Sequence, residues 1–418
     1  MPLPEPPGVP HTRAATCAGC GLVCDDIEVV VGERGGLEQL IRTCPLGDAW
    51  FAERVAPAPP VARVDGREAE LDRALDEAAA ILARARAPLV YGLGQTTCEA
   101  QRAAVALAEA IGGVIDPAGP LLDGASGLAY QTLGASTATL GEIRDRAEVV
   151  VVWRADPVAT HPRLFERLGL PAAGRALVVV DERRTATAAR ADAFLELPAE
   201  RDVEALWTLR ALVREVPIEP AVEPPLGELA ARLRACRNGA ILHRVRGHVE
   251  ALALHALVRD LCRVTHVVAV MLRREANAAG AEDVLAWQTG YPAAVSFARG
   301  HPRASPGELS AATVLERGEA DAALVVGSDP LEDLPPAAAA RLRAIPIVSL
   351  DPRDTATAAA ARVAFTTAAP GVHRAGVVHR LDGVPVPLRA PLATSRPGDD
   401  EVLAAIAGRL AQPREVLA

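Results

Sequence analysis

The chain has 418 residues, of which half are apolar and 23% are charged, a composition typical of a globular protein with more than one domain. Its net charge of −9 lacks the basic excess that nucleic-acid binding requires. The sequence contains no apolar run long enough to span a membrane, and its N-terminus lacks the features of a signal peptide. We therefore expect a cytoplasmic protein.

Residues 14–60 form a small segment that holds Cys17, Cys20, Cys24 and Cys44, with a strand expected at "DIEVVVG". In a reducing compartment, such a cluster favours a metal site over disulfides. The Cys-x2-Cys-x3-Cys spacing favours an iron–sulfur cluster, although four thiolates also suit zinc and the thiols could be empty. The scattered Cys98, Cys236 and Cys262 are interpreted as small buried apolar residues.

Alternating strands and helices are expected after this segment. Residues 55–66 have the composition of a linker, and a connecting amphipathic helix is predicted within 61–86. An apolar strand at 88–94 precedes a helix that ends in glycines, and two further apolar strands follow at 147–157 and 176–184. Fully apolar strands between helices predict a parallel sheet that is covered on both faces.

The second half of the chain repeats landmarks of the first. "ADAALVVGSDP" (320–330) resembles "AEVVVVWRADP" (147–157), and "LDPRDTATAAAA" resembles "VDERRTATAARA". We therefore predict an α/β fold with two related doubly wound parallel-sheet units, at 87–236 and 237–368. A short C-terminal portion, 369–418, is predicted to form a hairpin and a helix.

Four aspartates follow the repeated strands: Asp156, Asp181, Asp329 and Asp351. Ligands of such sheets lie beyond the carboxyl ends of the strands, so these loops could form a cradle for a nucleotide-bearing ligand. The alternative is that the Asp-Pro and Asp-x-Arg-x-Thr sequences only cap helices.

Several stretches together resemble the B subunit of formylmethanofuran dehydrogenase, within the molybdopterin-guanine-dinucleotide enzymes. They include "CAGCGLVCDDIEV", "DPVATHPR" and "WQTGYPAAVSFARGHPR". The resemblance implies a [4Fe-4S] cluster on Cys17, Cys20, Cys24 and Cys44. It also implies a vestigial cradle for pterin dinucleotides, and Arg273 and Asn277 correspond to polar residues that face the cofactor. The cradle residues are Asp156, His161, Asp181, Gly290, Asp329 and Asp351.

One departure from the family pattern concerns the redox metal. In active members, a cysteine followed by His-Gly-Pro ligates tungsten or molybdenum. Here the corresponding stretch is "LLDGASGLAYQTLG", which places Leu122 at the ligand position and Asp123 at the histidine. A leucine has no lone pair with which to bind a metal. The interpretation is that molybdopterin guanine dinucleotide and its molybdenum or tungsten are absent, and that no catalytic residue remains.

Relatives without this centre resemble the B subunit of the bacterial formyltransferase/hydrolase complex, which serves one-carbon metabolism in methylotrophs. The resemblance implies a scaffold subunit whose partners are the hydrolase A subunit, the C subunit and the formyltransferase D subunit. Two alternatives remain: a redox-active dehydrogenase subunit with another metal ligand, and an iron–sulfur electron carrier fused to an inactive domain.

Overall fold

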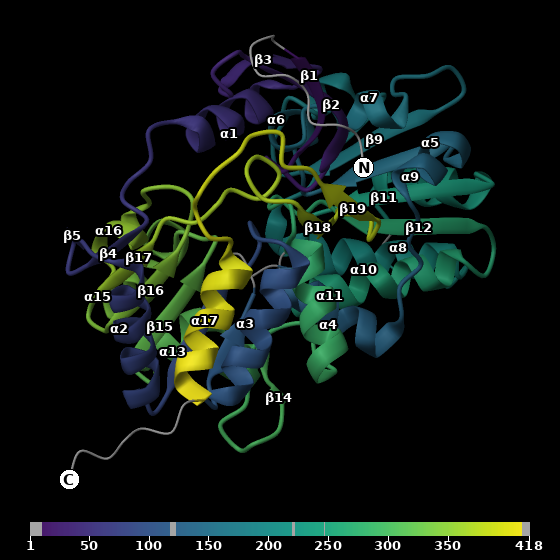
Figure 1. Ribbon diagram of the computed structural model, residues 1–418. Helices are drawn as coiled ribbons and strands as arrows, with labels where there is room; N and C mark the ends of the chain where they lie inside the picture. The colour runs from purple at the N-terminus through teal and green to yellow at the C-terminus, as the bar shows by residue number, and fades with distance from the viewer. Residues whose placement is uncertain (1–10, 118–122, 220–221, 246, 412–418) are drawn as a thin grey trace.

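The structure is a computed structural model that describes residues 11–117, 123–219, 222–245 and 247–411 (Figure 1). Its larger sheet has nine strands. The five central strands are parallel, and the two strands at each edge are antiparallel. Their order is β14 (Arg303–Ala304), β13 (Val295–Ser296), β7 (Val114–Asp116), β6 (Pro88–Gly92), β15 (Ala322–Val326), β16 (Ile347–Leu350), β17 (Val363–Phe365), β4 (Ala62–Val64) and β5 (Arg67–Glu68).

The second large sheet has five strands, all parallel. Almost every residue of its central strands is buried, as expected for a parallel sheet with both faces covered. The strand order is β10 (Ala193–Glu196), β9 (Ala176–Asp181), β8 (Val149–Trp153), β11 (Asn238–His243) and β12 (His266–Met271).

The five parallel strands of the larger sheet correspond one to one with the five strands of the smaller sheet. The order β17-β16-β15-β6-β7 in the larger sheet matches β10-β9-β8-β11-β12 in the smaller one. The prediction of an α/β fold with two related doubly wound units is thus confirmed. The units are permuted, however: β6 and β7 precede their sheet's repeated strands in the chain, whereas β11 and β12 follow theirs.

The expected boundary between residues 236 and 237 is therefore wrong. It would assign β6 and β7 to the first unit, but β6 pairs with β15. It would assign β11 and β12 to the second unit, but β11 pairs with β8. Apolar patterning identifies a buried strand but not its neighbour, because pairing depends on contacts between residues far apart in the chain.

Helices cover both faces of each sheet. One face of the larger sheet packs against α2 (Leu71–Arg84), α3 (Cys98–Ala110), α11 (Ala278–Thr289) and α17 (Asp399–Ala411), and the other against α13 (Ala311–Glu316) and α15 (Pro336–Arg343). The smaller sheet packs against α8 (Asp202–Val213), α9 (Pro224–Ala235) and α10 (His248–Leu261) on one face, and against α5 (Leu140–Arg146) and α7 (Leu164–Leu168) on the other. The remaining helical elements are α4 (Asp123–Leu133), α6 (Pro157–Thr160), η1 (Ala188–Arg190), η2 (Ala199–Arg201), α12 (Pro306–Leu309), α14 (Pro330–Asp333) and α16 (Ala356–Ala360).

The four-cysteine segment forms its own antiparallel sheet, which Figure 1 shows in purple at the top of the molecule. It consists of β1 (His11–Cys17), β2 (Cys24–Val31), β3 (Leu37–Ile41) and α1 (Pro45–Val55). The stretch expected to be a linker is only partly one, because β4 within it joins the larger sheet. The C-terminal hairpin, β18 (Gly376–His379) with β19 (Pro385–Leu388), and the final helix α17 are present as predicted.

No helix in the described part of the chain has both the length and the apolar character needed to cross a membrane.

Candidate functional site

The four cysteines of the N-terminal segment line one small hollow. Cys17 ends β1 and Cys24 begins β2, and these two residues pair across the hairpin. Cys20 lies in the turn between them, and Cys44 is the N-cap of α1. The hairpin and the helix start thus bring together every cysteine that the spacing predicted as a ligand.

Burial and charge act in opposite directions on thiolates in this hollow. Cys17, Cys20 and Cys24 are buried, and burial raises the pKa of Cys20 to about 12, with a further contribution from repulsion by Cys24 and Cys44. Arg163 lines the hollow, both Arg163 and Arg167 contact Asp26, and their positive charges favour the Cys24 thiolate. Buried thiolates of a metal cluster would gain from these two guanidinium groups.

Two kinds of metal centre, a zinc ion and an iron–sulfur cluster, are bound by four thiolates. Four thiolates around one tetrahedral zinc lie about 3.8 Å apart, because each Zn–S bond is about 2.3 Å long. Within the described residues, no group of three or more His, Cys, Asp or Glu side chains is arranged to hold one metal ion. The four thiols that line the hollow are a donor set that suits either a zinc ion or an iron–sulfur cluster.

The four-cysteine segment is attached to the carboxyl end of the smaller sheet. The Gly21 N–H donates to the Arg274 carbonyl oxygen at 3.0 Å, and the Leu381 N–H donates to the Gly21 carbonyl oxygen. A Cβ atom on Gly21 would lie 2.2 Å from the Arg273 carbonyl oxygen, so this approach requires glycine. The cysteine hollow and the loop after β12 are therefore held in fixed relation.

His161, predicted as a cradle residue, is part of this attachment. Its Nε2–H donates to the Arg273 carbonyl oxygen at 2.8 Å, while its Nδ1 accepts from the Thr160 hydroxyl, which fixes the tautomer. The ring is buried, and burial lowers its pKa to about 4. His161 is thus a neutral residue that supports the loop from within.

A cavity of about 340 Å³ opens at the carboxyl ends of β8 and β9. Asp156 and Asp181 line it, and burial raises the pKa of Asp181. Its cationic lining consists of Arg154, Arg183, Arg244 and Arg274. Carboxylates can accept hydrogen bonds from a base or a ribose, and guanidinium groups can bind phosphates. The lining therefore has side chains of the kinds that bind a nucleotide.

The larger sheet has the equivalent cavity, of about 510 Å³, at the ends of β15 and β16. Asp329, Arg353 and Thr355 line it, together with residues that follow α1. Asp351 does not line this cavity but is buried beneath it, where it pairs with Arg353 at 2.9 Å. The two cavities occupy corresponding places in the two units, as the repeated loops predicted.

Asp156 and Asp329 have the same local role in the two units. Asp156 accepts hydrogen bonds from the hydroxyl and the N–H of Thr187, at 2.5 and 3.0 Å. Asp329 accepts the same pair from Thr357, at 2.6 and 2.9 Å. Neither carboxylate caps the helix that follows it. Each instead ties together the two loops that border its cavity, a pattern that the matched Asp and Thr positions in the sequence could have suggested.

The other predicted site residues lie elsewhere. Gly290 ends α11 with a φ of 85°, accepts a hydrogen bond from Gln131, and is not among the residues lining the two cavities. Leu122, the proposed lost ligand position, lies outside the described residues. Asp123 is the first residue of α4, and its side chain is likewise not described.

Arg273 and Asn277 are buried in the loop between β12 and α11. Arg273 pairs with Glu282 at 2.6 Å, and both side chains are less than a tenth exposed. Asn277 donates to the Thr96 carbonyl oxygen and accepts from the His379 N–H, so it joins three distant parts of the chain. The Arg273–Glu282 pair was not predicted, because nothing in residue spacing alone distinguishes a buried ion pair from two surface charges.

Comparison with known proteins identifies the relatives of this chain, although no family model matches it. The B subunit of the tungsten-containing formylmethanofuran dehydrogenase 2 of Methanocaldococcus jannaschii is 34% identical over 404 residues, which span 90% of this chain and 93% of that protein. The chain belongs to the family of formylmethanofuran dehydrogenase B subunits. The family resemblance expected from the sequence is thus confirmed.

A subunit of a second complex and the crystal structure of that complex support this family assignment, and another protein shares the fold. The B subunit of the formyltransferase/hydrolase complex of Methylorubrum extorquens is 31% identical over 282 residues, covering 64% of this chain and 74% of that protein. The crystal structure of that complex with methylofuran matches with a TM-score of 0.71 at 29% identity, covering 84% of this chain and 98% of the matched chain. The acetylene hydratase of Pelobacter acetylenicus shares the fold, with a TM-score of 0.66 at 15% identity over 95% of this chain and 69% of its own.

Proposed function

We propose that this chain is the B subunit of a formyltransferase/hydrolase-type complex of one-carbon metabolism, and that it acts there as a scaffold without a molybdenum or tungsten redox centre. The observation that carries this proposal is the stretch "LLDGASG", which has Leu122 where a metal thiolate is expected. No cysteine occurs between Cys98 and Cys236 that could take its place. Cys98 itself is buried at the start of α3, where Asn277 contacts its sulfur.

The partners in this proposal are the proteins that accompany such a B subunit: the hydrolase A subunit, the C subunit and the formyltransferase D subunit. Its support is the similarity to the Methylorubrum complex, whose matched chain is covered almost completely. The bond-making steps would then take place on the other subunits.

The four cysteines are proposed to hold a [4Fe-4S] cluster with a structural role. Each of the four ligands is retained, and the segment's own core is small, so a cluster would supply cohesion that apolar burial cannot. Arg163 and Arg167 would offset part of its negative charge from the Cys24 side.

Elemental analysis with a visible spectrum on anaerobically purified full-length chain tests this proposal. We expect about four irons per chain and neither tungsten nor molybdenum. Serine replacement of Cys20 should remove the iron and its absorbance, whereas serine replacement of the remote Cys262 should leave both intact. About one tungsten or molybdenum atom per chain would contradict the proposal, because it would show that the redox metal centre is present.

A second candidate is a redox-active dehydrogenase subunit that binds molybdopterin guanine dinucleotide through another metal ligand. The observation that favours it is the presence of both nucleotide-sized cavities, with arginines and carboxylates in matching places. It predicts that denaturing the chain releases a pterin with its characteristic fluorescence and a guanine nucleotide. A metal-free chain that releases neither compound would exclude this candidate.

A further inference from the structure

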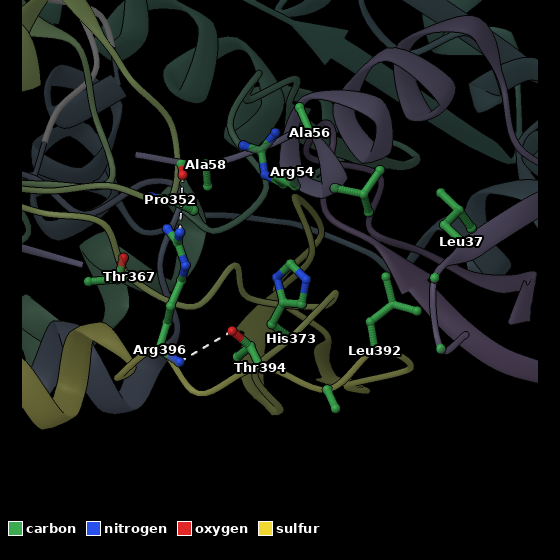
Figure 2. Close-up of a pocket in the computed structure, with 14 residues that line it drawn as sticks. Leu37, Arg54, Ala56, Ala58, Pro352, Thr367, His373, Leu392, Thr394 and Arg396 are labelled. Atoms are coloured by element: carbon green, nitrogen blue, oxygen red, sulfur yellow. Dashed lines mark hydrogen bonds between the residues drawn. The ribbon is translucent and has the colours of Figure 1, made fainter. Parts of the chain in front are cut away.

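A further cavity, of about 430 Å³, lies where the four-cysteine segment meets the C-terminal loop before α17 (Figure 2). It borders the nucleotide cavity of the larger sheet, with which it shares Ala56, Ala58 and Pro352. The two cavities share no charged lining residue, and the volume of this cavity is that of a small-molecule site. The family assignment gives it no role.

The charged lining of this cavity is entirely basic. Arg54, His373 and Arg396 line it, and no aspartate or glutamate is among its lining residues. Burial lowers the pKa of His373, with a smaller contribution from Arg396, so the positive charge at neutral pH belongs to the two guanidinium groups.

Arg396 has no carboxylate partner within the described residues. Its Nη2 donates to the carbonyl oxygens of Pro59 and Ala58, at 2.8 and 3.3 Å. Its Nη1 is buried and has no hydrogen-bond partner. Because no carboxylate in the described structure pairs with this partly buried cation, its charge favours an anion in the cavity that Arg396 lines.

Arg54 adds a second cation, which the carboxylates of Asp351 and Glu53 stabilise electrostatically. Its side chain is 4% exposed, and its nearest carboxylate, on the mostly exposed Glu53, lies 3.4 Å away. The Arg54 Nη1–H donates to the Trp50 carbonyl oxygen, and its guanidinium lies over the Trp50 ring. Burial lowers the pKa of Arg54 to about 10, and repulsion by Arg353 contributes in the same direction.

The wall opposite Arg396 is apolar. Figure 2 shows Leu37 and Leu392 on one side of the cavity, Arg396 on the other and His373 between them. A ligand that satisfies both walls therefore needs an anionic group and a hydrocarbon body. Two guanidinium groups favour a dianion over a monocarboxylate.

We propose that this cavity binds a small organic phosphate, with its phosphate group against Arg396 and Arg54 and its carbon body against Leu37 and Leu392. Such a ligand joins the four-cysteine segment to the C-terminal loop. It also contacts the end of α1, the helix whose N-cap is Cys44.

Isothermal titration calorimetry on the full-length chain with phenyl phosphate tests this proposal, with inorganic phosphate and benzoate as comparison ligands. We expect phenyl phosphate to bind tightest, because only it offers both a dianion and an apolar body. Arg396→Gln should weaken phenyl phosphate binding roughly tenfold or more, and Arg396→Lys should weaken it less. Arg214→Gln, which removes an exposed arginine far from the cavity, should change nothing.

A second variant keeps the test decisive if Arg396→Gln does not fold. Leu37→Ala should weaken phenyl phosphate binding and leave inorganic phosphate binding unchanged. The proposal is overturned if phenyl phosphate does not bind at millimolar concentration. It is equally overturned if binding is unchanged in both the Arg396 and Leu37 variants, because such binding belongs to the nucleotide cavities.

Discussion

Buried arginines near the sheet ends are held by carboxylates from distant elements. Arg154, which follows β8, donates to both carboxylate oxygens of Asp202 and to the carbonyl oxygens of Leu197 and Pro198. Trp153 also donates to Asp202, and both members of the ion pair are largely buried. This network fixes the carboxyl end of β8, where the cavity of the smaller sheet opens.

Replacing Asp202 tests how much this network contributes. Asp202→Asn leaves the buried Arg154 charge uncompensated, so we expect the free energy of unfolding to fall by about 3 kcal/mol. Urea denaturation measures this loss. Arg201→Gln, which breaks only exposed pairs such as that with Glu204, is the control and should leave the free energy nearly unchanged. An equal, small effect of both changes would contradict a stabilising role for the buried network.

A pair of buried histidines without hydrogen-bond partners in the described structure makes stability sensitive to acid. His243 and His255 stack edge to face with ring centroids 5.7 Å apart, and Tyr130 contacts His255. Burial lowers the pKa of His255 to about 4 from its usual 6.5. The folded state therefore binds a proton at His255 only at lower pH than the unfolded state does.

This difference predicts that the contribution of His255 to the free energy of unfolding is complete above pH 6.5. The contribution decreases as the pH falls to about 4, by about 3 kcal/mol over that window. Unfolding free energies of the wild type and of His255→Phe, measured across this range, check the sign. The variant should show a shallower decline, whereas His301→Gln at an exposed loop should follow the wild type. Parallel curves for wild type and His255→Phe would refute the prediction.

The attachment of the four-cysteine segment depends on one residue of its hairpin turn. Gly21→Ala would force a Cβ atom into the Arg273 carbonyl oxygen, so we expect a loss of about 1–3 kcal/mol of stability. Faster proteolysis of residues 14–60 should accompany this loss, together with a lower content of the iron that the proposed cluster would supply. Gly36→Ala is the matched control, because no atom lies within 4 Å of its added Cβ. Equal stability of the two variants would show that the close approach of Gly21 to Arg273 does not contribute to stability.

The permuted order of the two units determines which piece of the chain can fold alone. Residues 136–274 contain all five strands of the smaller sheet, whereas residues 87–236 contain parts of both sheets and neither one whole. We expect the first fragment to unfold cooperatively in circular dichroism and the second to lack a cooperative transition. The opposite result would mean that the sheets depend on each other for their formation.

The sequence alone was sufficient for features that depend on neighbouring residues. Apolar runs identified β6, β8, β9, β15 and β16, and helical spacing identified α2, α3 and α17. Strand and helix formation respond to local patterns, so a single sequence can reveal them. The cysteine spacing predicted a shared hollow for the same reason, since a hairpin and a helix start bring nearby residues together.

The tertiary structure decided everything that depends on contacts across the chain. It paired β6 with β15 and β11 with β8, and so replaced two consecutive units by two permuted ones. It also showed that Asp156 and Asp329 tie loops to Thr187 and Thr357, which local capping rules do not predict. Strand pairing, ion pairs and cavities arise from residues far apart in sequence, whose mutual placement is fixed only when the whole core packs.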